Sequence, residues 1–189
     1  MIRLAAVAAL AVMVSACGGG AVKGGSGVVA PDGRIGSLRI DVSTYADVIA
    51  FAGKPDLITT FKTSWPGVPT SRAIGYSCAH FSGARRDPAG YCATVYYVNL
   101  RTHRLAAFES DSKAFTSPSG TQPGMATSDV VRREHSSPGG PLVAIVRQAK
   151  QSTFAIDFTC SRPGPGCVLD HVNSLRIESR KHPIGLLFT

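Results

Sequence analysis

Two short segments have apolar positions at helical spacing, and each follows a start rich in Ser or Thr. The segments are VSTYADVIAF, which predicts a helix over residues 43–52, and MATSDVVRRE, which predicts a helix over residues 126–135. Ser43 or Thr44 can cap the first helix, because a hydroxyl there accepts from a free backbone N–H. Pro55 lies just beyond it, where a proline stops a helix. The pattern therefore predicts two short helices far apart in the chain.

Stretches rich in β-branched and aromatic residues follow each predicted helix, and these predict strands. The order is a helix and then an antiparallel meander of four strands, twice, which is an α+β fold. The predicted strands are 57–63, 73–81, 92–99 and 104–109 after the first helix, and 142–148, 153–160, 167–172 and 174–179 after the second.

An internal repeat supports this division. The segment AIGYSC at residues 73–78 matches AIDFTC at residues 155–160, with identical residues at three of the six positions. At the same offset, Asp47-Val48 matches Asp129-Val130, so each predicted helix contains one of these pairs. Repeats at such periods indicate tandem structural units. The predicted units are residues 34–112 and 113–189.

The N-terminus has the pattern of an export signal. Arg3 precedes an apolar run of about eleven residues, which is too short to span a membrane. The following Val-Ser-Ala-Cys17 resembles the lipobox of bacterial lipoproteins. This resemblance implies that residues 1–16 are cleaved and that Cys17 is lipidated with fatty acyl chains such as palmitate. The protein is then anchored to the cell membrane or the outer membrane, outside the cytoplasm. Residues 18–33 contain seven glycines, so we expect 17–33 to form a flexible tether.

Four cysteines remain besides Cys17, and an even number in an exported chain predicts disulfides. Three pairings are possible, and the repeat selects Cys78–Cys92 and Cys160–Cys167, one in each unit. Cys78, His80 and Cys92 have the ligand types of a zinc site. The second unit has Arg162 in place of the histidine, whereas disulfides explain both units. We therefore expect no metal and no cofactor.

Positive charge is in excess but is not concentrated. The chain has 20 Lys+Arg against 12 Asp+Glu. No basic run is long enough to indicate a nucleic-acid-binding arm, so we expect no nucleic-acid partner. The expected partners are the membrane, through the lipid anchor, and an unidentified envelope or extracellular protein.

The duplicated unit resembles a known fold family. Its features are a helix with an Asp-Val pair, a terminating Gly53-Lys54-Pro55 and a strand meander, and Gly124-Met125-Ala126 is similar to a Gly-Met-Thr motif. The whole resembles the β-lactamase-inhibitor-protein-like fold and the related SmpA/OmlA outer-membrane lipoproteins. The first unit departs from the motif, with Asp41-Val42-Ser43 at that position. The resemblance implies protein binding through a concave sheet, but it transfers no target.

The sequence contains no recognisable catalytic motif, so we expect a protein-binding module, either an envelope assembly platform or an inhibitor-like one, rather than an enzyme. The alternative is a ligand-sensing or hydrolytic envelope protein, which a deep pocket lined by converging polar groups would favour. Aromatic residues and arginines are favoured at binding surfaces. The candidate contact residues of this kind are Trp65, Phe81, Arg85, Arg86, Tyr91 and Tyr96.

Overall fold

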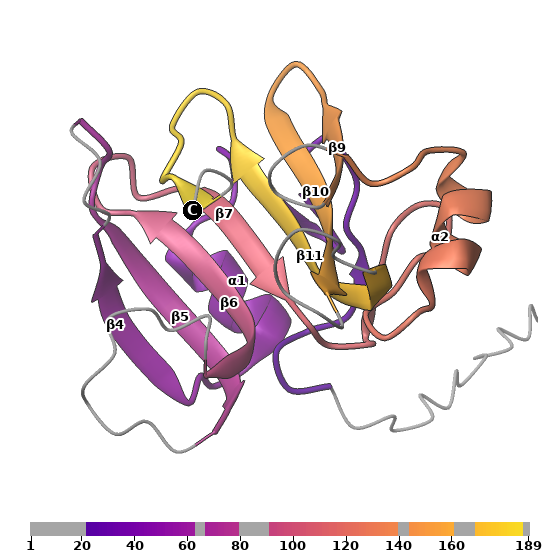
Figure 1. Cartoon of the computed structure of the whole chain (residues 1–189). Coiled ribbons are helices and arrows are strands. Elements are labelled where there is room, and N and C mark those ends of the chain that lie inside the picture. Colours follow the sequence, from indigo (N-terminus) through magenta and orange to yellow (C-terminus); the bar gives the residue numbers. More distant parts are fainter. Residues whose placement is uncertain (1–21, 63–66, 80–90, 140–143, 161–168, 187–189) are drawn as a thin grey trace, which may run out of the picture.

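The computed structural model describes residues 22–62, 67–79, 91–139, 144–160 and 169–186. Seven of its strands are β4 (Leu57–Phe61), β5 (Ser71–Cys78), β6 (Cys92–Asn99), β7 (Leu105–Ser110), β9 (Ala144–Gln148), β10 (Ser152–Cys160) and β11 (Leu169–Ser179). They form one antiparallel sheet in the order β4-β5-β6-β7-β11-β10-β9 (Figure 1). This sheet is the frame on which the rest of the chain packs.

Two helices and two small strand pairs complete the architecture. The helices are α1 (Tyr45–Ala52) and α2 (Thr127–Glu134). Strand β1 (Gly27–Val28) pairs in parallel with β8 (Phe115–Thr116), and β2 (Arg34–Ile35) forms a hairpin with β3 (Leu38–Arg39). Helix α1 lies behind the sheet in the view of Figure 1, and α2 lies beyond its β9 side.

The predicted α+β fold of two repeats, each a helix followed by a four-stranded meander, is wrong. The protein is mostly β, and strands from both predicted units share one sheet, because β7 pairs directly with β11. Two strands were predicted, at 167–172 and 174–179, but residues 169–179 form the single strand β11, and residues 167 and 168 lie outside the described residues. Asn173 lies at a register shift within it, since Ser174 pairs with Asp157 and Val172 with Phe158. Among the described residues after α2, the strands are therefore β9, β10 and β11.

Local sequence explains both helices, which lie within two residues of the predicted bounds. In α1, Thr44 and Asp47 form a reciprocal capping box, in which Thr44 N–H donates to Asp47 Oδ2 at 2.7 Å. Gly53, with φ 79°, ends α1 in a conformation that favours glycine. Helix α2 has no side-chain cap at its start and ends at His135, which has φ 49° in the left-handed region.

The N-terminal segment packs against the protein from residue 22 onward. Val29 is fully buried, and the carbonyl of Gly24 accepts a hydrogen bond from the Tyr96 hydroxyl at 2.7 Å. A Cβ on Gly25 would lie 2.4 Å from the Phe51 ring, so the glycine is needed for close approach. Residues 22–33 therefore pack against the folded protein and bury Val29 and Ala30, whereas the sequence predicted a flexible tether there.

One face of the sheet holds the larger hydrophobic core, beneath both helices and the N-terminal segment. Aromatic rings run through this core at edge-to-face geometry. Tyr96 contacts Phe51, Tyr76 and Phe108, with ring centroids 6.5, 5.8 and 5.0 Å away, and Phe108 contacts Phe115 at 4.8 Å. This face of the sheet is therefore closed to partners over its centre.

Candidate functional site

The predicted contact residues divide into three groups. Tyr96 is fully buried in the core beneath α1, so its assignment as a contact residue is wrong. Tyr91 is half-buried against the opposite face of the sheet. The remaining predictions, Trp65, Phe81, Arg85 and Arg86, lie outside the described residues.

The predicted disulfide between Cys78 and Cys92 is confirmed. It joins the last residue of β5 to the first residue of β6, with an S–S distance of 2.03 Å. Cys160 is also disulfide-bonded, whereas its predicted partner Cys167 lies outside the described residues. The predicted lipidation site, Cys17, lies outside them too.

The resemblance implied binding through a concave sheet. Residues 180–186, the C-terminal segment, fold back over part of the sheet face opposite the helices. Ile184 and Leu186 are buried there beside Val95 and Tyr97. The Glu178 carboxylate accepts hydrogen bonds from the backbone N–H groups of Ile184, Gly185 and Leu186. The centre of this face is therefore occupied by the chain itself.

A buried ion pair on the same face fixes the end of this segment. The Arg176 guanidinium donates to both carboxylate oxygens of Asp157, and its Nη1 donates to the carbonyl of Leu186 at 2.8 Å. The two side chains are only 13% and 9% exposed. This ion pair is buried and its hydrogen bonds are made within the protein. We therefore assign it the structural role of holding the C-terminal segment against the sheet.

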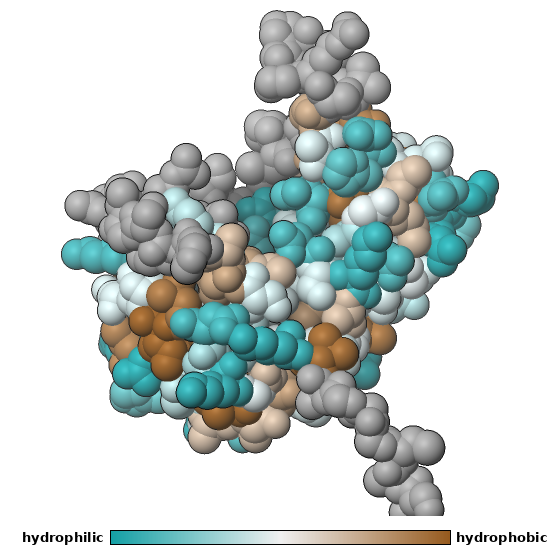
Figure 2. Space-filling model, turned by 90° about the horizontal axis from the view of Figure 1, so that it is seen from below, coloured by the Kyte–Doolittle hydropathy of each residue, from teal (hydrophilic) through white to brown (hydrophobic). Residues whose placement is uncertain are grey.

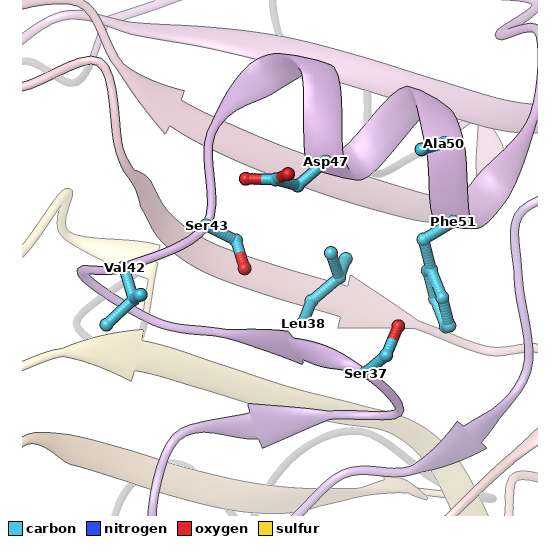
Figure 3. A pocket seen from close by; sticks show the side chains of 7 residues that line it. All are labelled: Ser37, Leu38, Val42, Ser43, Asp47, Ala50 and Phe51. Atoms are coloured by element: carbon cyan, nitrogen blue, oxygen red, sulfur yellow. The ribbon is translucent and has the colours of Figure 1, made fainter.

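A cleft between α1 and the β2–β3 hairpin is open at the surface; we call it the α1–hairpin cleft (Figure 3). Its volume is about 450 Å³. Leu38 points from the hairpin toward the helix, and Phe51 points from the helix toward the hairpin. Val42, at the rim, is 56% exposed, a large fraction for an apolar side chain. The full lining is Ser37, Leu38, Val42, Ser43, Asp47, Ala50 and Phe51.

Among the residues that the structure describes, Asp47 is the only charged one that lines the α1–hairpin cleft. The backbone and side-chain hydrogen bonds from Thr44 hold the pKa of its carboxyl below the usual value, so it is ionised at neutral pH. The nearby Ser43 hydroxyl is engaged by the backbone N–H of Arg39, at 3.0 Å. The cleft is thus a mixed surface of apolar side chains and serine hydroxyls, with one negative charge.

A second cleft, the α2 cleft, lies beside the C-terminal end of α2 and has a volume of about 510 Å³. Its most unusual group is the Glu134 side chain, which is only 2% exposed. The lining consists of Pro31, Pro118, Ser119, Arg133, Glu134, His135, Arg147 and Phe154. This cleft is lined by basic side chains and one buried carboxylate, whereas the charged residue in the α1–hairpin cleft is acidic.

Hydrogen bonds keep the buried Glu134 carboxylate ionised. Burial alone would raise the pKa of this carboxyl, but donation by the hydroxyls of Ser117, Thr121 and Ser119, together with the charge of Arg147, lowers it overall. The Ser117 and Thr121 hydroxyls lie 2.6 and 2.7 Å from Oε1. A group held as a carboxylate in this way is an acceptor and not an acid catalyst.

The sequence analysis did not identify the residues of either cleft as site residues. One of them, Asp47, could have been placed from a sequence signal. The spacing of Thr44 and Asp47 is that of a capping box, which could have placed Asp47 at the first turn of α1. Glu134 meets Ser117 and Thr121 only through the fold, because they lie 17 and 13 residues away in the chain.

The face of the molecule seen from below has no single dominant apolar patch. Figure 2 shows apolar patches separated by hydrophilic residues on that face. Across the ranges that the structure describes, no helix has the length and apolar character needed to cross a membrane. Within the same ranges, no group of three or more His, Cys, Asp or Glu side chains is placed to hold a metal ion.

Comparisons with known proteins give a distant structural likeness. No protein-family model matches the chain. No curated protein matches it either. A solved structure similar to it is that of the uncharacterized protein yfeY from Escherichia coli, at 15% sequence identity and a TM-score of 0.47, with 81% of this chain and 99% of that chain covered.

Proposed function

We propose that the chain is an exported lipoprotein, lipidated at Cys17, and that it binds a protein partner of the cell envelope through the α1–hairpin cleft. The observation that carries the binding proposal is the lining of this cleft, which sets the apolar side chains of Val42 and Phe51 beside polar groups, is open to solvent and is edged by one carboxylate. The export signal and the lipobox-like residues before Cys17 carry the lipoprotein proposal.

The lining favours docking over chemistry. Among the described residues that line the cleft, Asp47 has the only titratable side chain, and its carboxylate accepts hydrogen bonds from both the N–H and the hydroxyl of Thr44, the N-cap of α1. Acid–base or nucleophilic catalysis needs at least two groups in mutual reach, such as a nucleophile and its base. The α1–hairpin cleft offers one carboxylate that is already committed to the helix, so the proposed role is binding.

The chemistry of the cleft defines the partner. An apolar side chain of the partner would insert between Leu38 and Phe51 and cover Val42, and a Lys, Arg or backbone N–H group beside it would face Asp47. Covering the exposed half of a valine contributes about 1 kcal/mol, which is useful but small. Several such contacts along one partner segment are therefore needed for stable binding.

The packed N-terminal segment places the cleft close to the membrane in this proposal. Phe51 in the cleft wall contacts the Gly25 backbone, so the cleft lies beside the N-terminal segment. Only five residue steps separate Cys17 from Val22, the first described residue, and five steps span at most about 18 Å. A lipid on Cys17 would hold the cleft near the headgroups, so the partner is a membrane protein or one bound to the same surface.

Two variants with the same substitution test the binding proposal. Val42→Arg places a charge at the rim of the cleft, whereas Val146→Arg places one on β9, where the valine is 45% exposed. We expect Val42→Arg to abolish co-purification of the partner from detergent-solubilised envelope and Val146→Arg to preserve it. Equal retention in both variants would refute the assignment of the cleft.

The lipoprotein proposal has its own test. Cys17→Ser removes the thiol that would be acylated, so the protein should move from the membrane fraction to the soluble exported fraction. Unchanged membrane association of the Cys17→Ser protein would contradict the lipid anchor.

A further inference from the structure

We propose that the α2 cleft is a binding site for a phosphate group. The cleft combines two arginines, a histidine and a serine from different elements around one space of about 510 Å³. This inference is independent of the proposed protein partner, because it concerns another cleft and another chemistry.

Three basic side chains of the α2 cleft have hydrogen-bonding capacity to spare. Among the described residues, Arg133 and His135 have no hydrogen-bond or ion-pair partner. Arg147 uses only its Nη2, which donates to the carbonyl and to the carboxylate of Glu134 at 2.6 and 3.2 Å. Its Nε and Nη1 have no acceptor in the part of the chain that the structure describes, and guanidinium groups of this kind bind oxyanions in a forked geometry.

The one carboxylate in the lining does not prevent anion binding. Glu134 is buried, and its two oxygens already accept hydrogen bonds from three hydroxyls in addition to Arg147. With two guanidinium groups against one carboxylate, the net charge of the lining is positive at neutral pH. Glu134 also holds Arg147 at the edge of the cleft, so it positions a donor for the ligand.

Arg147 is held in place before any ligand arrives, whereas the Arg133 side chain is exposed. Arg133 lies against the backbone of Gly120, where an added Cβ would come within 3.1 Å of its Nη1. Arg147 is fixed by the Glu134 carbonyl, and Pro31 and Pro118 form stiff parts of the wall. Preorganised donors bind an anion better than mobile ones because less side-chain entropy is lost.

A phosphate fits this arrangement better than a carboxylate does. A phosphate group has at least three strong acceptor oxygens, whereas a carboxylate has two, and the cleft offers unused donors from Arg133 and His135 at the end of α2 and from Arg147 on β9. A soluble phosphate ester and a lipid headgroup share this chemistry, so the experiment must distinguish the two sources.

The test is a titration of the purified full chain with inorganic phosphate and glycerol 3-phosphate, followed by backbone amide NMR shifts. A second arm measures binding to vesicles of phosphatidic acid, with phosphatidylcholine vesicles as the reference. We expect saturable shifts at residues 119, 133–135 and 147, or specific binding to the phosphatidic acid vesicles. Either result supports the site, and the arm that responds identifies the source of the phosphate.

Neighbouring arginines provide the matched control. Arg133→Gln should weaken binding at least tenfold, whereas Arg132→Gln should change it less than twofold. Arg132 is on the same helix turn, but it points away to solvent and pairs with Asp129 at 2.5 Å. Equal weakening by both substitutions would show attraction to overall charge and overturn the proposal, and so would the absence of saturable binding in both arms.

Discussion

Glu134→Ala should be among the most destabilising single substitutions in the α2 region. The Glu134 side chain is 2% exposed, and its carboxylate accepts from the hydroxyls of Ser117 and Thr121, which are 1% and 0% exposed. Truncation leaves these two buried donors without their acceptor, at a cost of about 1–3 kcal/mol each. Ser119 and Arg147 are exposed enough for water to replace the lost contact. We therefore expect a loss of about 3–4 kcal/mol.

Urea denaturation at pH 7 measures this loss directly. Glu134→Ala should lower the denaturation midpoint without changing the slope, since the surface exposed on unfolding is nearly the same. Glu134→Gln is the matched variant, because its amide oxygen can still accept from one hydroxyl, and it should cost about 1–2 kcal/mol. A loss below about 1 kcal/mol for the alanine variant would refute the claim that this carboxylate organises α2 and its neighbouring loop.

The pH dependence of the same pair of proteins provides a second check. The folded-state pKa of Glu134 is lowered, so its contribution to stability is present above the unfolded value, about 4.3, and is lost as pH falls through the folded value. Glutamine does not titrate. The difference in unfolding free energy between the native protein and Glu134→Gln should therefore shrink as pH is lowered from 6 to 3. A constant difference would contradict the assignment.

Three further predictions concern the core and its supports. Replacing Cys78 and Cys92 together by serine should cost about 3 kcal/mol in urea denaturation, because the bridge closes a loop of sequence separation 14; no change on reduction would count against it. Tyr96→Phe should cost about 1 kcal/mol and speed amide hydrogen exchange in the N-terminal segment, because the bond to the Gly24 carbonyl is lost; unchanged exchange would show that the segment is held otherwise. Arg176→Met should destabilise the protein by about 3–5 kcal/mol, because a buried carboxylate loses its partner, and thermal unfolding at an unchanged midpoint would disprove this.

The helices and most strands could be predicted because their signals are local. Thr44 and Asp47 form the capping box that starts α1, and the β-branched and aromatic residues Ile74 and Tyr76 favour the strand β5. The prediction of two strands in place of β11 was wrong because of Asn173. Asparagine is typical of turns, but Asn173 lies at a register shift within a continuous strand. Local chemistry at a turn and at a bulge is similar, and only the pairing with β10 distinguishes them.

The errors about the tether and the contact residues have nonlocal causes. Glycine is compatible with both a flexible spacer and close packing, and here Gly25 gives room to the Phe51 ring. Strand alternation correctly puts Tyr96 and Tyr97 on opposite faces, but both are fully buried because the C-terminal segment covers the second face. The C-terminal segment covers this face by folding back over the sheet. The local sequence of the strands does not predict such a long-range contact.

Site-specific photo-crosslinking in living cells tests the central proposal most directly. A photoreactive residue at position 42 reports on the rim of the α1–hairpin cleft, and one at position 146 reports on an exposed valine elsewhere. The account predicts one discrete envelope-protein adduct from position 42 that disappears with the added substitution Ala50→Arg, and no such adduct from position 146. Adducts of the same pattern from both positions, or none from position 42, would contradict it.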